Sequence, residues 1–94
     1  MSNASISQFD KGSLDKLDYE WDWSRWLTGS EKITSASFIL PTGINLETNG
    51  HSDTTATAWL SGGNLGSNYL VGCLIETDEG RKANRNILIR IVQR

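Results

Sequence analysis

Few side chains in the sequence could carry catalysis, and the single histidine and the single cysteine are the first candidates. His51 follows Asn49 and Gly50, a dipeptide typical of turns, where a histidine is usually a solvated side chain. A nucleophilic site needs a nucleophile, a base and a group that orients the base, and only Asp53 lies near His51 in the sequence. Cys73 stands among alternating apolar residues, which favours a buried thiol over a reactive one. We therefore predict no catalytic residues and no enzymatic activity.

Three carboxylates, at Asp18, Glu20 and Asp22, form a second candidate site, which Asp15 could join. Carboxylate oxygens are the ligands that hard cations prefer. A calcium loop, however, curls around its ion with a glycine at the bend, whereas residues spaced by two along a strand extend too far to meet at one ion. We therefore favour a solvated or partner-facing acidic row and predict no metal site.

A glycine-rich segment at residues 61–66 is the third candidate. A loop that cradles phosphate groups leads directly into the N-terminus of a helix. Here the flanking residues alternate as strands do, so we interpret the segment as a turn and predict no cofactor.

Length and charge exclude several classes of protein. The chain has 94 residues, a net charge of −2 and a sequence pI near 5.2, which suit one domain and argue against nucleic-acid or anionic-membrane partners. A single cysteine cannot form an intrachain disulfide and indicates a reducing folding compartment. We find no signal-peptide pattern and no apolar run long enough to span a membrane.

The elements that must position these residues begin with an aromatic stretch at residues 18–27. Tyr19, Trp21 and Trp23 alternate with the three carboxylates, so a strand would place rings and carboxylates on opposite faces. We expect the rings to face the core, the carboxylates to face outward, and Trp26 with Leu27 to cap one end of the core after a turn. Tyr19, Trp21, Trp23 and Trp26 thus form the structural signature that we predict for the fold.

The rest of the chain reads as short strands with turn residues between them. Ala36, Phe38 and Leu40 share one parity of a half-buried strand, and both parities of residues 69–76 are apolar, which predicts a central strand. We expect about seven short strands in an all-β, immunoglobulin-like sandwich with Greek-key connections. The antibody signature is incomplete, because Cys73 has no second cysteine and Tyr69 lies four residues before it rather than two.

We divide the chain into an N-terminal arm at residues 1–13 and the sandwich domain at residues 14–94. The arm is polar, with Ile6 and Phe9 as its large apolar residues. It is either a frayed, flexible terminus or a segment that becomes ordered on a partner.

Trp59 is the candidate for a contact surface. If Ala56, Ala58 and Leu60 face the core, the alternation of a strand turns Trp59 outward. Buried rings are the usual case, but both sides of these strands cannot be core in a two-layer sandwich, and tryptophan is enriched as an interface anchor. We predict partner contacts at Ile6, Phe9 and Trp59.

An ordered series of short motifs also resembles a known family. The motifs are Leu17-Asp18-Tyr19, Asp22-Trp23-Ser24, Trp26-Leu27, Ile33-Thr34-Ser35-Ala36-Ser37, Ala56-Thr57-Ala58-Trp59-Leu60-Ser61-Gly62-Gly63, then Gly66, Tyr69, Val71, Cys73, Ile75, Thr77, Gly80-Arg81, Arg85, Ile87 and Ile89. Together they resemble the small fibre–tail adaptor proteins of tailed bacteriophages, which have an immunoglobulin-like sandwich. The chain departs from that pattern at residues 10–13, where the expected proline is absent.

The resemblance implies a structural virion protein of the tail, assembled in the host cytoplasm. It would join the N-terminal segment of a tail fibre to the head–tail connector or other tail proteins, in several copies around the tail. An alternative is a capsid or tail decoration domain that binds host carbohydrate, because an exposed tryptophan can stack on sugar rings.

Overall fold

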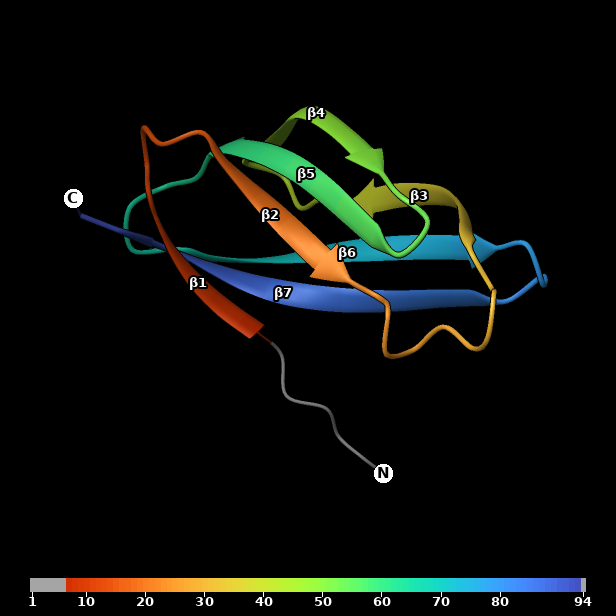
Figure 1. Ribbon diagram of the computed structural model, residues 1–94. Helices are drawn as coiled ribbons and strands as arrows, with labels where there is room; N and C mark the ends of the chain where they lie inside the picture. The colour runs from red at the N-terminus through yellow and green to blue at the C-terminus, as the bar shows by residue number, and fades with distance from the viewer. Residues whose placement is uncertain (1–6, 94) are drawn as a thin grey trace.

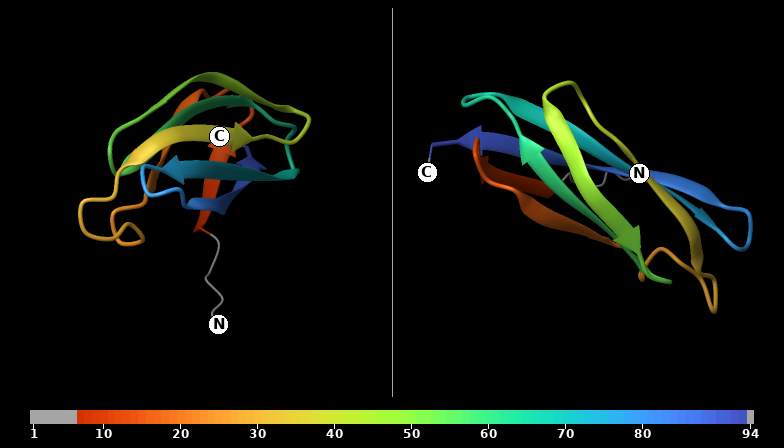
Figure 2. Two further views of the ribbon diagram at one scale, coloured as in Figure 1. Left: turned by 90° about the vertical axis from the view of Figure 1, so that its right-hand side faces the viewer. Right: turned by 90° about the horizontal axis from the view of Figure 1, so that it is seen from above.

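The computed structural model describes residues 7–93, which form seven strands in two packed sheets (Figures 1 and 2). The described part of the chain contains no helix. The strands are β1 (Ser7–Gly12), β2 (Leu17–Asp22), β3 (Ile33–Ile39), β4 (Ile44–His51), β5 (Thr55–Gly62), β6 (Asn68–Thr77) and β7 (Lys82–Val92).

One sheet has the strand order β1-β7-β6-β3 and the other has the order β2-β5-β4. Two hairpins, β4–β5 and β6–β7, join neighbouring strands, while the other connections pass from one sheet to the other (Figure 1). All strand pairs are antiparallel except β1 with β7. This is the predicted immunoglobulin-like sandwich, and β6 lies in the interior of its sheet as expected.

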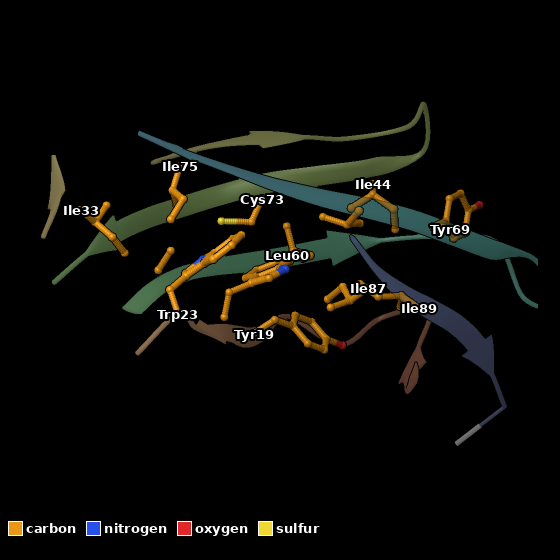
Figure 3. Packing of buried hydrophobic residues seen from close by; sticks show 14 of the residues in the cluster. Tyr19, Trp23, Ile33, Ile44, Leu60, Tyr69, Cys73, Ile75, Ile87 and Ile89 are labelled. Carbon is orange, nitrogen blue, oxygen red and sulfur yellow. The ribbon is translucent and has the colours of Figure 1, made fainter. Parts of the chain in front are cut away.

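The core lies between the sheets and follows the alternation of the strands (Figure 3). In the register of β2 with β5, Tyr19 pairs with Ala58 and Trp21 pairs with Ala56. Small residues beside large rings on one face let the interior reach a close-packed density. The buried apolar residues are Tyr19, Trp21, Trp23, Ile33, Ile44, Ala56, Ala58, Leu60, Tyr69, Val71, Cys73, Ile75, Ile87, Ile89 and Ile91.

Tyr69 forms a tyrosine corner despite its unusual spacing from Cys73. Its hydroxyl accepts a hydrogen bond of 2.9 Å from the backbone N–H of Asn64, in the turn before β6. A tyrosine near the start of this strand that bonds to backbone a few residues upstream is a hallmark of immunoglobulin-like domains. Its ring also packs on Gly43, where a Cβ would lie 3.1 Å from a ring carbon and the backbone has a φ of +105°. The corner therefore needs glycine at position 43.

The first described residues differ from the expected arm. Residues 7–12, which we assigned to the arm, form β1 and pair with β7 from Ser7 opposite Ile87 to Gly12 opposite Val92. Lys11 is fully buried there. The expected flexible arm is therefore corrected over residues 7–12, because backbone pairing with β7 holds them as an edge strand. Residues 1–6, and with them Ile6, lie outside the described residues.

The expected turn at Asn49 and Gly50 is also wrong, since both residues lie inside β4. The chain reverses after β4 ends at His51. There the Ser52 hydroxyl accepts hydrogen bonds from the backbone N–H groups of Thr54 at 3.2 Å and Thr55 at 3.0 Å. A serine side chain that bonds to backbone two and three residues ahead stabilises a turn by itself.

An ion pair between a buried glutamate and a partly exposed arginine lies near the β6–β7 turn. The Glu31 side chain is buried, and its carboxylate accepts hydrogen bonds from Arg81 Nε at 2.9 Å and from the Thr77 hydroxyl at 2.6 Å. The Arg81 guanidinium lies 3.9 Å from the centre of the Trp26 ring and donates to the Trp26 carbonyl at 3.2 Å. Arg81 and Thr77, together with the backbone N–H of Thr28, hold the pKa of Glu31 far below its ordinary value.

Candidate interaction surfaces

The histidine and the cysteine do not form a catalytic site. His51 is exposed, and its Nδ1 lies 2.9 Å from the carbonyl oxygen of Ser52. Cys73 and Trp23 project from opposite sheets into the same part of the core (Figure 3). Burial raises the pKa of the Cys73 thiol to about 11, although the nearby Trp23 lowers it. The thiol is therefore protonated at neutral pH and closed to reagents.

No cluster of three or more histidine, cysteine, aspartate or glutamate side chains suited to a metal ion occurs among residues 7–93. Over the same residues there is no helix that could cross a membrane.

Trp59 lies on the outer face of the β2-β5-β4 sheet and is 37% exposed. Its neighbours on β5, Ala58 and Leu60, are fully buried, so the strand turns the indole to the outside. In the register of the sheet it stands between Asp18 of β2 and Thr48 of β4. An exposed ring in the middle strand of a sheet is accessible to a flat partner surface.

The carboxylates of β2 continue this outer face. Asp18, Glu20 and Asp22 are exposed and lie opposite Trp59, Thr57 and Thr55 of β5. The backbone N–H of Ser24 donates to Asp22 at 2.9 Å and lowers its pKa, with a smaller contribution from nearby arginines. None of the three strands contains lysine or arginine. The face thus combines one indole, a carboxylate row and threonine hydroxyls.

A groove runs along the open side of the sandwich, where the edge strands β1 and β2 belong to different sheets. Its volume is about 250 Å³. Phe9 is 40% exposed at its rim, and its ring packs edge-on against Tyr19, with 5.3 Å between the ring centres. The groove is lined by Ser7, Phe9, Glu20, Trp21, Asp22, Arg85, Asn86 and Ile87.

Arg85 lines this groove and links its two sides. Its guanidinium lies 4.4 Å from the centre of the Trp23 ring and donates to the carbonyl of Asp22 at 3.2 Å. The Trp21 indole N–H donates in turn to the carbonyl of Arg85 at 3.1 Å. These contacts join β2 to β7 across the open side, so the groove has walls from both sheets.

The structure does not gather the predicted contact residues into one site. Phe9 lies at the groove, Trp59 lies on an outer face, and Ile6 falls outside the described residues. Of the structural signature, Tyr19, Trp21 and Trp23 are buried, and Trp26 packs on Trp23 with 5.6 Å between ring centres. The carboxylates of β2 point to solvent.

Sequence reasoning missed one exposed apolar face, on the β1-β7-β6-β3 sheet. Apolar residues on both parities of β6 indicated a central strand, which is correct, but the second parity is not covered by another layer. Leu70 is 47% exposed and Ile39 on the adjacent β3 is 55% exposed. The double apolar parity was the signal that could have found this face.

Comparison with known proteins adds a family and a fold. A family model described as Podophage GP4 fiber-tail adaptor protein gp77 matches residues 11–90. Among solved structures, the chain is similar to the PKD domain from KIAA 1837 protein, with 14% identity, a TM-score of 0.54, and coverage of 99% of this chain and 92% of that chain. At that identity the likeness concerns the fold alone. None of the curated proteins compared with the chain matches it.

Proposed function

The chain belongs to the podophage fibre–tail adaptor family, and we propose that it joins the N-terminal segment of a tail fibre to the head–tail connector through side-chain surfaces, without catalysis. As a member of this family it is a structural protein of the phage tail that interacts with fibre and tail proteins. The fibre segment, the connector, several copies around the tail and assembly in the host cytoplasm are the finer parts of the proposal.

The observation that carries the proposal is the exposed Trp59 on an outer face without basic residues. Tryptophan is over-represented among the side chains that dominate binding energy. The carboxylates of Asp18, Glu20 and Asp22 beside it lie within reach of one partner surface. We infer that this face receives a fibre segment that carries lysine or arginine, whose cations pair with the carboxylates and pack on the indole.

The groove at Phe9 supports a second contact. It presents apolar rings beside Glu20, Asp22 and Arg85, and it opens next to the first described residue, Ser7. Phe9, together with Ile6 before it, would contact the second neighbour of the adaptor, a tail protein. An adaptor between a fibre and a tail protein requires a separate binding surface for each of them.

The test is binding of the purified chain to the N-terminal segment of its cognate fibre, measured by calorimetry. We expect a stable complex that Trp59→Ala weakens by about tenfold or more, since interface anchors cost at least that much on truncation. Leu65→Ala is the matched control, because Leu65 is 58% exposed in the β5–β6 turn, beside the residues of the β1–β2 turn. Absence of any complex with the intact fibre segment would refute the proposal.

The second candidate is a decoration domain that binds host carbohydrate. An exposed indole flanked by carboxylate and hydroxyl oxygens is an arrangement that can stack on and hydrogen-bond a sugar ring. A glycan array on the intact protein separates the two functions. Binding that Trp59→Ala abolishes would favour carbohydrate, whereas a blank array removes this candidate.

A further inference from the structure

The outer face of the β1-β7-β6-β3 sheet has a definite pattern of residues. Leu70, Gly72, Leu74 and Glu76 alternate with core residues of β6 and therefore point outward. Residues paired across antiparallel strands lie on the same face of a sheet. The residues of β3 and β7 that pair with these four therefore also lie on the outer face. The pairs are Leu70 with Leu88, Gly72 with Asn86 and with Ile39, Leu74 with Asn84, and Glu76 with Lys82.

Leucine and isoleucine side chains lie on this face around two asparagine amides. Ile39 and Leu70 are exposed, and Leu74 and Leu88 are partly buried. Gly72 has no side chain to rise between them, and the amides of Asn84 and Asn86 lie over it, with a hydrogen bond of 3.3 Å joining them. Exposed apolar side chains gathered on one face with polar groups beside them favour a protein contact there.

The charges on the face identify its occupant. Glu76 and Lys82 stand side by side at one end, and neither makes an ion pair within residues 7–93. A two-fold axis parallel to the strands, between β6 and β7, would exchange the two strands in a facing copy. Lys82 would then meet Glu76 of the partner subunit, and Leu70 would meet Leu88 of the partner subunit.

The other in-plane two-fold axis, perpendicular to the strands, gives a poorer fit. If it crosses the strands at Gly72 and Asn86, it places each strand over its own copy in the opposite direction. Lys82 would then meet Arg90 of the partner subunit, and Glu76 would meet Asn68 of the partner subunit. Arg90 is already paired with Asp10, and Glu76 would face no cation, whereas an isologous interface must be complementary to itself. The charge pattern therefore selects the axis that runs along the strands.

We propose that this face binds a second copy of the chain, in a two-fold dimer in which Leu70 meets Leu88 of the partner subunit and Lys82–Glu76 pairs form at one end. The proposal uses a different face from Trp59 and does not rest on the proposed fibre contact. A fibre-binding surface on each subunit would remain open on the outer side of the dimer.

Sedimentation equilibrium of the full-length chain over a wide range of concentration tests the proposal. We expect a reversible dimer, with a dissociation constant that Leu70→Glu raises by about tenfold or more because it places a charge against the apolar side chain of Leu88 in the contact. Leu65→Glu, the same substitution at an exposed turn, leaves the dimer intact. Near-ultraviolet circular dichroism verifies that both variants are folded.

Charge reversal tests the axis. Lys82→Glu and Glu76→Lys each weaken the dimer, and the double variant restores it because the pairs across the axis are re-formed with opposite polarity. A wild-type chain that stays monomeric throughout, a dimer that Leu70→Glu does not weaken, or a double variant without restored dimer would each overturn the proposal. A monomer whose fibre binding is weakened by Leu70→Glu would assign the face to the fibre instead.

Discussion

The buried ammonium group of Lys11 donates a hydrogen bond of 2.6 Å to the backbone carbonyl of Gly62, and this contact joins the two sheets. Lys11 lies on β1 of one sheet and Gly62 ends β5 of the other. The same ammonium donates to the carbonyl of Gly12 at 2.8 Å. Burial lowers the pKa of Lys11, and the carboxylate of Asp15 opposes that shift. Lys11 therefore ties the two sheets through backbone oxygens, and the carbonyl of Gly12 also accepts a hydrogen bond of 3.1 Å from the backbone N–H of Asp15.

Lys11→Met should therefore destabilise the domain. The variant keeps the buried stem but removes the ammonium donor from the carbonyls of Gly62 and Gly12, although the Gly12 oxygen keeps its bond from the Asp15 N–H. The lost hydrogen bonds should cost about 1–3 kcal/mol of unfolding free energy. Urea denaturation followed by tryptophan fluorescence measures the loss. Lys16→Met, at an exposed lysine in the following turn, is the matched control. Equal stability of the two variants would contradict the role of Lys11.

The lowered pKa of Glu31 predicts that the stability of the domain falls in acid. Its pKa in the folded chain lies far below the ordinary value of 4.5, mainly because of Arg81 and Thr77. The folded state thus binds fewer protons than the unfolded state in acid, so this contribution is present above pH 4.5 and is lost as the pH falls further. Thermal denaturation between neutral and strongly acidic pH should show this decline.

Glu31→Gln provides the check on that interpretation. We expect a less stable protein at neutral pH with a shallower decline in acid, because the titrating group is gone. Glu20→Gln, at an exposed carboxylate, should leave the acid decline unchanged. An unaltered decline in the Glu31 variant would mean that other carboxylates control acid unfolding.

Truncation of two tryptophans should cost very different amounts of stability. Trp23 is 1% exposed and packs against Trp26, so Trp23→Ala should cost about 3–5 kcal/mol of stability. Trp59 is 37% exposed, so Trp59→Ala should lower the free energy of unfolding by less than about 1 kcal/mol, since surface substitutions are usually near neutral. Chemical denaturation of both variants measures the difference. A large loss of stability in the Trp59 variant would place that indole in the core.

Cys73 should be inert in the folded protein. Its side chain is fully buried, and its pKa of about 11 keeps the thiol protonated at neutral pH. An aromatic disulfide reagent at pH 8 should react only slowly with the native chain and rapidly in denaturant. Fast labelling of the native protein would show that the core opens around β6.

Much of the fold could be predicted from the sequence because the alternation of a strand is a local property. The rings of Tyr19, Trp21 and Trp23 on one parity indicated a buried face, and the alanines on β5 indicated another. The motif series pointed to the fibre–tail adaptor family, which the match over residues 11–90 confirms. The outward direction of Trp59 followed from the same parity.

Other features were decided only by the tertiary structure, because they depend on which distant segments meet. The parallel pairing of β1 with β7 made an edge strand of residues that look like a polar arm. The ion pair of Glu31 with Arg81 spans fifty residues, and no local pattern predicts it. Alternation likewise shows that Leu70 faces away from Cys73, but not whether a second layer covers it. Burial of that face is set by packing between sheets or between molecules, and the fold leaves it open.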